Sequence, residues 1–151
     1  MIYILTGNEN YVKSLNYNKN EIYHIYNDKS ESIHRSIVVN DKEKVIKLIE
    51  SSDNGVIRIW NFHTGILLNK IKVSNNYLCG ISLLNEDYLF VGCFDGAIKL
   101  VDLNNGTVIN LYKHNYSVIT LKLISCPKYG KCLISQGLLR GELNIWINNL
   151  I

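Results

Sequence analysis

The sequence contains little that would interrupt regular structure or enter a membrane. Its 151 residues include a single proline, Pro127, and no apolar run near the roughly 18 residues that a membrane-spanning helix needs. The first ten residues, MIYILTGNEN, lack the basic segment and the long apolar core of a secretory signal. We therefore expect a cytoplasmic protein, with the nucleus as an alternative, whose four cysteines are free thiols.

Charge is sparse and evenly spread. Charged residues make up 19% of the chain, and the net charge of +3 comes from 16 basic and 13 acidic residues that are interspersed. No basic run of the kind that binds nucleic acid or anionic lipid is present. We expect neither nucleic acid nor a membrane as a partner, while the 47% share of hydrophobic residues predicts a folded globular protein.

Motifs for catalysis or cofactor binding are also lacking. There is no G-x-S-x-G elbow, no H-E-x-x-H pair and no phosphate-binding glycine loop, and the four histidines are far apart in the sequence. Cys126 and Cys132 flank a predicted hairpin, either as structural thiols or as half of a metal site, but no CxxC or paired histidines supply further ligands. We expect no enzyme activity, no cofactor and no metal.

What the sequence does contain is a repeat. NGVIRIWN (54–61), DGAIKLVD (95–102) and RGELNIWI (140–147) each join a turn to an alternating strand. The alternation places Ile57 and Ile59 on one face of the strand and Arg58 on the other. Clusters of Gly, Asn and Asp recur about every 8–12 residues, which is typical of an all-β protein built from hairpins.

Each full repeat unit is predicted to hold four strands, named a to d in chain order. The a strands are 33–39, 77–84 and 117–124; the b strands are 44–51, 87–93 and 131–137; the c strands are 55–61, 96–102 and 142–147; the d strands are 63–73 and 104–114. The stretch DKEKVIKLIESS (41–52) also fits a short amphipathic helix. Its β-branched residues and the matching context of the other b strands favour a strand.

The N-terminal residues fit a degraded copy of the same unit. Three strands are predicted there, at 3–7, 10–16 and 21–27. The positions Leu15, Trp60, Val101 and Trp146 then become equivalent, at intervals of about 40–45 residues.

A four-stranded unit of this length, with an aromatic third strand, resembles the WD40 β-propeller family over essentially the whole chain. The matching positions are the b–c turn pairs Asn54-Gly55, Asp95-Gly96 and Arg140-Gly141, the tryptophans Trp60 and Trp146, the aspartate Asp102, and the tetrad members His114 and Ser135. The sequence departs from the family in that no repeat has Trp and Asp together. Arg140 also stands where the last repeat should have the acid of the hydrogen-bonded tetrad.

The resemblance implies an all-β, partial WD40-type propeller of about three and a half four-stranded antiparallel blades. The units are an incomplete blade at 1–27, blades at 28–73 and 74–114, and a last blade at 115–151 that lacks its outer strand. Because propellers have about four to eight blades, we expect the chain to be one part of a larger propeller. Its open blade edges offer a route to self-association.

The resemblance further implies a non-catalytic scaffold that binds other proteins. Two alternatives stay open: a partner- or substrate-recognition domain of a larger signalling or ubiquitin-ligase protein, and, less favoured, nucleic-acid or phosphoinositide binding. The d–a loops and b–c turns share one rim, where such proteins bind partners. That rim is expected to carry Asn76, Tyr77, Phe94, Asp95, Tyr116, Leu139 and Arg140.

Two interpretations stay open for several of these rim residues. Tyr77 and Tyr116 border predicted strands, so each either contacts a partner or packs against its own sheet. Arg140 suits an acidic or phosphorylated partner, or is simply solvated.

Overall fold

All regular secondary structure in the described part of the chain is β-structure. The computed structural model describes residues 3–8, 11–28, 33–40, 45–139 and 142–147, in which fourteen strands form four antiparallel sheets. The all-β prediction is therefore confirmed. Within these ranges there is no helix with the length and apolar character needed to cross a bilayer.

The two outer sheets have three strands each, and the two central sheets have four. Sheet 1 contains β1 (Tyr3–Asn8), β2 (Tyr11–Asn16) and β3 (Glu21–Tyr26), and sheet 4 contains β12 (Val118–Cys126), β13 (Gly130–Gly137) and β14 (Leu143–Ile147). Sheet 2 contains β4 (Ile33–Asn40), β5 (Ile46–Ser52), β6 (Val56–Asn61) and β7 (Leu67–Lys72). Sheet 3 contains β8 (Leu78–Leu83), β9 (Tyr88–Cys93), β10 (Ala97–Asp102) and β11 (Val108–Lys113).

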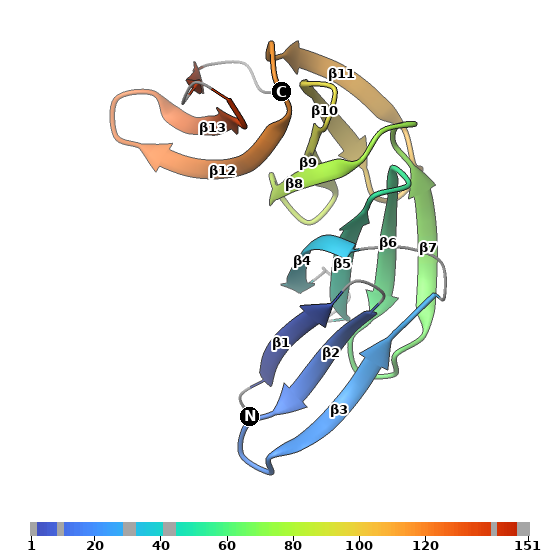
Figure 1. The fold of residues 1–151 in the computed structure, drawn as a ribbon. Coiled ribbons are helices and arrows are strands. Elements are labelled where there is room, and N and C mark those ends of the chain that lie inside the picture. Colours follow the sequence, from blue (N-terminus) through green and yellow to red (C-terminus); the bar gives the residue numbers. More distant parts are fainter. Residues whose placement is uncertain (1–2, 9–10, 29–32, 41–44, 140–141, 148–151) are drawn as a thin grey trace.

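Every sheet is a meander in which strands pair in chain order. The described part of the segment that also fitted a helix forms strand β5 over Ile46–Ser52, as the strand interpretation predicted, and residues 41–44 lie outside the described residues. The four sheets follow one another along an open arc, and both ends of the arc face the same side (Figure 1). Strands β4, β8 and β12 lie along the inside of the arc, where β8 contacts both of the others.

The strand registers define equivalent positions in the four sheets. One cross-strand pair recurs in each of them: Ile4–Leu15, Leu48–Trp60, Leu89–Val101 and Leu133–Trp146. The register thus places Leu15, Trp60, Val101 and Trp146 at one repeated position, which supports the equivalence inferred from their spacing.

Apolar layers between neighbouring sheets form the core. Ile57 and Ile59 of sheet 2 share a buried cluster with Leu89 and Val101 of sheet 3. Similar clusters join sheet 1 to sheet 2 and sheet 3 to sheet 4. Each fully buried aliphatic side chain of this kind contributes about 1.5–3 kcal/mol, so the sheets are stabilised by stacking on one another.

In each of the two central sheets, one turn with a glycine contacts the loop that leads to the next sheet. Gly55 and Gly96 have φ values of +77° and +86°, and a Cβ at these positions would lie only 2.0 Å from Ser74 O and 2.3 Å from His114 O. Gly96 O accepts a hydrogen bond from His114 N at 2.8 Å. Only glycine combines this backbone conformation with so close an approach. The turns therefore determine the geometry of one rim of the arc.

Candidate functional site

The rim just described carries the residues that were predicted from the sequence to lie there. It is formed by the loops after β7 and β11 and by the turns that follow β9 and β13. The six predicted residues that the structure describes are here named the rim patch: Asn76, Tyr77, Phe94, Asp95, Tyr116 and Leu139. Arg140 and Gly141 lie outside the described residues.

Exposed apolar side chains make up the centre of the rim patch. The rings of Tyr77 and Phe94 lie 5.5 Å apart, and these side chains are 52% and 50% exposed. Leu139 is 54% exposed. The backbone of Phe94 is held by its N–H, which donates to Tyr77 O at 2.9 Å. Its carbonyl accepts from the Ser117 hydroxyl at 2.6 Å, so hydrogen bonds hold the backbone that carries the exposed ring.

A hollow of about 230 Å³ opens beside Phe94. Its walls include four residues of the rim patch, namely Phe94, Asp95, Tyr116 and Leu139. A second hollow of about 530 Å³ extends along β10 and β11, and Asp95 also lines this one. The smaller hollow is below the usual range for small-molecule pockets, about 300–1,000 Å³. It suits a single side chain of a bound peptide or protein loop.

Asp95 is the charged group at the junction of the two hollows. Its Oδ1 accepts a hydrogen bond from Ala97 N at 3.1 Å, and its Oδ2 accepts one from Asn76 Nδ2 at 3.0 Å. These bonds fix the orientation of the carboxylate. Because a carboxylate has about four acceptor sites, the exposed oxygens can still accept from a cationic or amide group.

Behind the rim, His114 is buried between sheets 3 and 4. His114 Nε2 and Ser135 Oγ share a hydrogen bond of 2.6 Å, and Trp146 Nε1 donates to the same hydroxyl at 2.7 Å. Glu142 Oε2 lies 3.3 Å from His114 Nδ1. His114, Ser135 and Trp146 were expected from the sequence, whereas Glu142 was missed. The sequence offered one indication of this role, namely that Glu142 is an acidic residue two positions after Arg140 in the same turn segment.

The interface of sheets 1 and 2 has charged groups at the corresponding positions. Arg58 Nε donates to Asp28 Oδ2 at 2.8 Å, Glu50 Oε1 lies 3.9 Å from the same Nε, and Lys70 Nζ lies 2.6 Å from Asp28 Oδ2. Arg58 and Glu50 are only 2% and 1% exposed. Lys70 and Arg58 hold the pKa of Asp28 below its ordinary value, whereas burial raises the pKa of Glu50 to about 7.

This charged group was not anticipated from the sequence. Its signal was the presence of Glu50 and Arg58 inside strands that are otherwise apolar. The two residues are a direct cross-strand pair, and the equivalent pair is Val91 and Lys99 in sheet 3.

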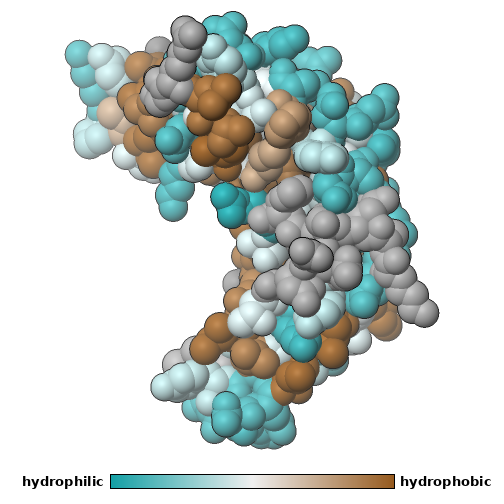
Figure 2. Space-filling view, viewed as in Figure 1, coloured by the Kyte–Doolittle hydropathy of each residue, from teal (hydrophilic) through white to brown (hydrophobic). Residues whose placement is uncertain are grey.

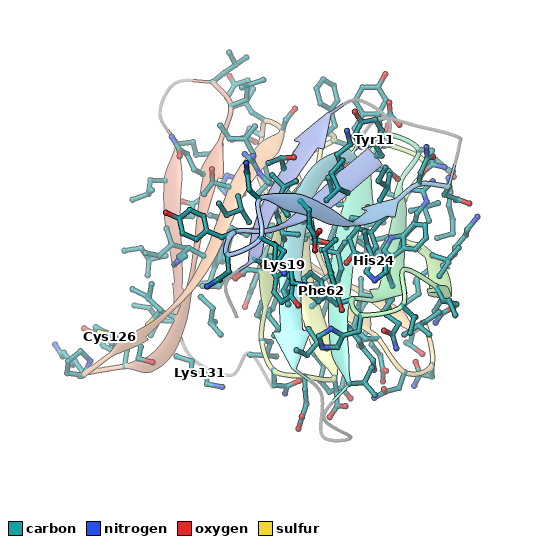
Figure 3. All side chains as sticks on the ribbon, turned by 90° about the horizontal axis from the view of Figure 1, so that it is seen from below. Tyr11, Lys19, His24, Phe62, Cys126 and Lys131 are labelled. Atoms are coloured by element: carbon teal, nitrogen blue, oxygen red, sulfur yellow. The ribbon has the colours of Figure 1, made fainter. Side chains whose placement is uncertain are left out.

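An aromatic cluster closes the opposite rim between sheets 1 and 2. Tyr3 packs against Tyr23 and Phe62 with ring centroids 4.8 and 5.2 Å away. The Tyr23 hydroxyl bonds His63 Nδ1 at 3.1 Å. His24 Nε2 contacts the carbonyl of His63, and Figure 3 shows His24 near Phe62. These histidines therefore have structural partners.

The Cys126 and Cys132 thiols lie on the β12–β13 hairpin, whose tip projects from the molecule (Figure 3). Hydrogen bonds from the backbone of Lys128 and Tyr129 lower the pKa of Cys126. Over the part of the chain that the structure describes, no three His, Cys, Asp or Glu side chains gather in a way that could hold a metal ion. The side chain of His34 lies outside that part.

Comparisons with known proteins establish the fold without naming a family. No family model and no curated protein sequence matches the chain. Among 878 solved chains that match the structure are two computationally designed proteins. Ika4 has a TM-score of 0.77 at 14% identity, over 97% of this chain and 86% of its own. Ika8 has a TM-score of 0.75 at 14% identity, over 98% of this chain and 43% of its own. The likeness concerns the fold alone.

Proposed function

We propose that the protein is a non-catalytic protein-binding module of the WD40 propeller type, which holds a segment of a partner protein on the rim patch. One observation carries this proposal. Loops and turns far apart in the sequence bring six exposed or half-exposed residues to one rim, and four of them line a hollow of about 230 Å³. Aromatic side chains beside a small pocket are typical of binding hot spots.

Several structural features support the propeller interpretation. The four sheets are meanders that stack along an arc with their first strands inside. His114, Ser135 and Trp146 form the hydrogen bonds that the WD40 resemblance implies for its last unit. In this interpretation sheets 1 to 4 are three and a half blades, with sheet 1 lacking its inner strand and sheet 4 its outer strand.

The chemistry of the rim patch defines the class of partner segment. Phe94, Tyr116 and Leu139 offer an apolar wall, and Asp95 offers a fixed carboxylate beside it. A matching segment would place an aliphatic or aromatic side chain in the hollow and a lysine or arginine next to it. Charge-assisted hydrogen bonds of this kind are stronger than neutral ones.

Affinity capture with surface variants tests the proposal. The immobilised full chain and its Phe94→Ala and Asp95→Asn variants would be exposed to a lysate of the source cells, and bound proteins would be quantified by mass spectrometry. Truncating a hot-spot aromatic costs about 2 kcal/mol or more, so Phe94→Ala should reduce capture of the specific partner roughly 30-fold. Asp95→Asn keeps the shape of the turn and should weaken capture less, mainly at low salt.

Tyr129→Ala serves as the matched control. Tyr129 is an exposed aromatic residue, 40% accessible, in the β12–β13 turn. This variant should capture the same proteins as the unaltered chain. Equal capture by Phe94→Ala and by the unaltered chain would contradict a role for the rim patch.

A further inference from the structure

The face of sheet 1 that points away from sheet 2 is an uncovered stacking surface. Ile4 is 44% exposed, although the residues at its register position in the other sheets, Leu48, Leu89 and Leu133, are each 0% exposed. Those three are buried because a preceding sheet packs on them. Ile22, the cross-strand neighbour of Leu15 on the same face, is 50% exposed.

The opposite end of the arc has the complementary surface. Leu143 of β14 is 58% exposed, whereas its register equivalents Ile57 and Ile98 are each 0% exposed beneath the following sheet. Ile145 is 53% exposed, and its equivalent Ile59 is 4% exposed. The ends of the arc thus present the two halves of an interface that the chain already forms three times.

We propose that these two end faces bind each other between two copies of the chain, so that sheet 4 of each copy stacks on sheet 1 of the other. The product is a closed ring of eight sheets, four from each copy. The proposal concerns the end faces and does not depend on the rim patch, which lies on neither of them.

The character of both faces favours a second copy as the occupant. The sheet 1 face carries Ile4, Leu15, Ile22 and Ile25, and the sheet 4 face carries Ile134, Leu143, Ile145 and Ile147. Both sets are aliphatic, and so are the buried equivalents Leu48, Leu89 and Ile59 inside the chain. Trp60 and Trp146 stand at the position of Leu15, and one lysine lies on each end face, Lys13 opposite Ile25 and Lys122 opposite Ile134. Figure 2 shows apolar surface toward both ends of the arc. A contact between them would repeat a packing that the sequence already supports at equivalent positions.

The shape of the arc favours a closed pair. Both ends open toward the same side, so two arcs can face each other and join at both ends (Figure 1). Once the first end has paired, the second contact is intramolecular, and its high effective concentration stabilises the pair over an open series of chains. A head-to-tail contact that did not close would give filaments instead.

Light scattering during size-exclusion chromatography measures the outcome directly. At micromolar concentration the full chain should elute as a single species of twice its 17.3 kDa mass. Ile4→Lys and Ile145→Lys should each shift this species to the monomer mass, because a charge would be buried in both contacts. The double variant Ile4→Lys with Ile145→Asp places opposite charges in the same contact, since the equivalents Leu133 and Leu100 share one buried cluster, and should restore much of the dimer.

Leu68→Lys and Ile109→Lys are the matched controls. These residues are 48% and 49% exposed on the outer strands β7 and β11, away from both ends. Both variants should remain dimers, as should Phe94→Ala. A monomer at micromolar concentration, a polydisperse series of larger species, or dissociation by the outer-strand variants as readily as by the end-face variants would each overturn the proposed ring.

Discussion

The interface between sheets 1 and 2 and the interface between sheets 3 and 4 share one geometry but differ in their buried polar chemistry. At the first, Asp28 follows the last strand of sheet 1 and contacts Arg58, which pairs with Glu50 across the strands. At the second, His114 follows the last strand of sheet 3 and bonds Ser135. The first interface buries a group of acidic and basic side chains to different degrees, whereas the second is built around hydrogen bonds of a histidine, a serine and a tryptophan, with Glu142 beside the histidine.

The central interface shows what this difference means. Between sheets 2 and 3, Val73 and Val91 occupy the equivalent positions and belong to the apolar cluster. Lys99, the equivalent of Arg58, reaches out to donate to Val73 O at 2.9 Å. Stacking therefore does not require a polar group here. The apolar pairs found at every interface hold the sheets together. The interfaces differ at the position held by Glu50, Val91 or Ser135, so mutations there should change stability by different amounts at each interface.

Arg58→Met should produce the largest effect. At pH 8, above the Glu50 pKa of about 7, it leaves the Glu50 carboxylate buried without its cation, and removing one partner of a buried pair typically destabilises a protein by about 3–5 kcal/mol. Urea unfolding followed by tryptophan fluorescence would report the change through Trp60, two residues away in the same strand.

Lys99→Met is the matched control for this variant. It replaces a lysine, rather than an arginine, by methionine at the same register position beside the uncharged Val91, so the loss should stay below about 1 kcal/mol. Equal losses for the two variants, at one protein concentration, would contradict the importance of the buried charge.

Glu50→Gln should change how stability depends on pH. The folded pKa of Glu50, about 7, lies above its ordinary value of 4.5. Between pH 4.5 and pH 7, Glu50 therefore keeps its proton in the folded state but has lost it in the unfolded state. The resulting stability is present below pH 4.5 and is lost as the pH rises through 7. At about 1.4 kcal/mol per pKa unit, the difference of about 2.5 units corresponds to a loss of about 3.5 kcal/mol over the whole range, and the glutamine variant should avoid it.

The measurement is the free energy of unfolding at pH 5 and pH 8 for both proteins. The difference between the two pH values should be larger for the unaltered chain by up to about 3 kcal/mol. Asp28 does not contribute to it, because its lowered pKa affects stability only below its ordinary value of 3.8. The exposed Glu21→Gln is the control, and a pH response of Glu50→Gln identical to that control would refute the assignment.

Local patterns in the sequence were sufficient to predict the strands and their order. Alternation identified β6 and β10, and the turn residues marked their ends, because both signals depend only on near neighbours. The rim patch could also be predicted, because the resemblance to WD40 repeats implies that the d–a loops and b–c turns share one rim. Its role as a partner site stays a prediction.

The buried charged residues could not be predicted from the sequence in the same way. Alternation places Arg58 on the face opposite Ile57, but whether that face meets solvent or another sheet depends on stacking between distant segments. Glu142 was missed for a local reason. The last turn has one extra residue, which moves the acid away from the position that the repeat predicts.

Ser135→Val should produce the smallest of these effects and test the hydrogen bonds around His114. It gives sheet 4 the residue type that sheet 3 has at Val91, and it removes the hydroxyl shared by His114 and Trp146. Leaving buried donors unpaired costs about 1–3 kcal/mol, and we expect about 2. Adding His114→Val removes one of those groups, so the double variant should lose less stability than the sum of the single variants. A double-mutant cycle in urea should give a coupling of about 1 kcal/mol. Additive losses would show that the two side chains contribute independently, in which case the hydrogen bond at 2.6 Å would not be what distinguishes this interface from the central one.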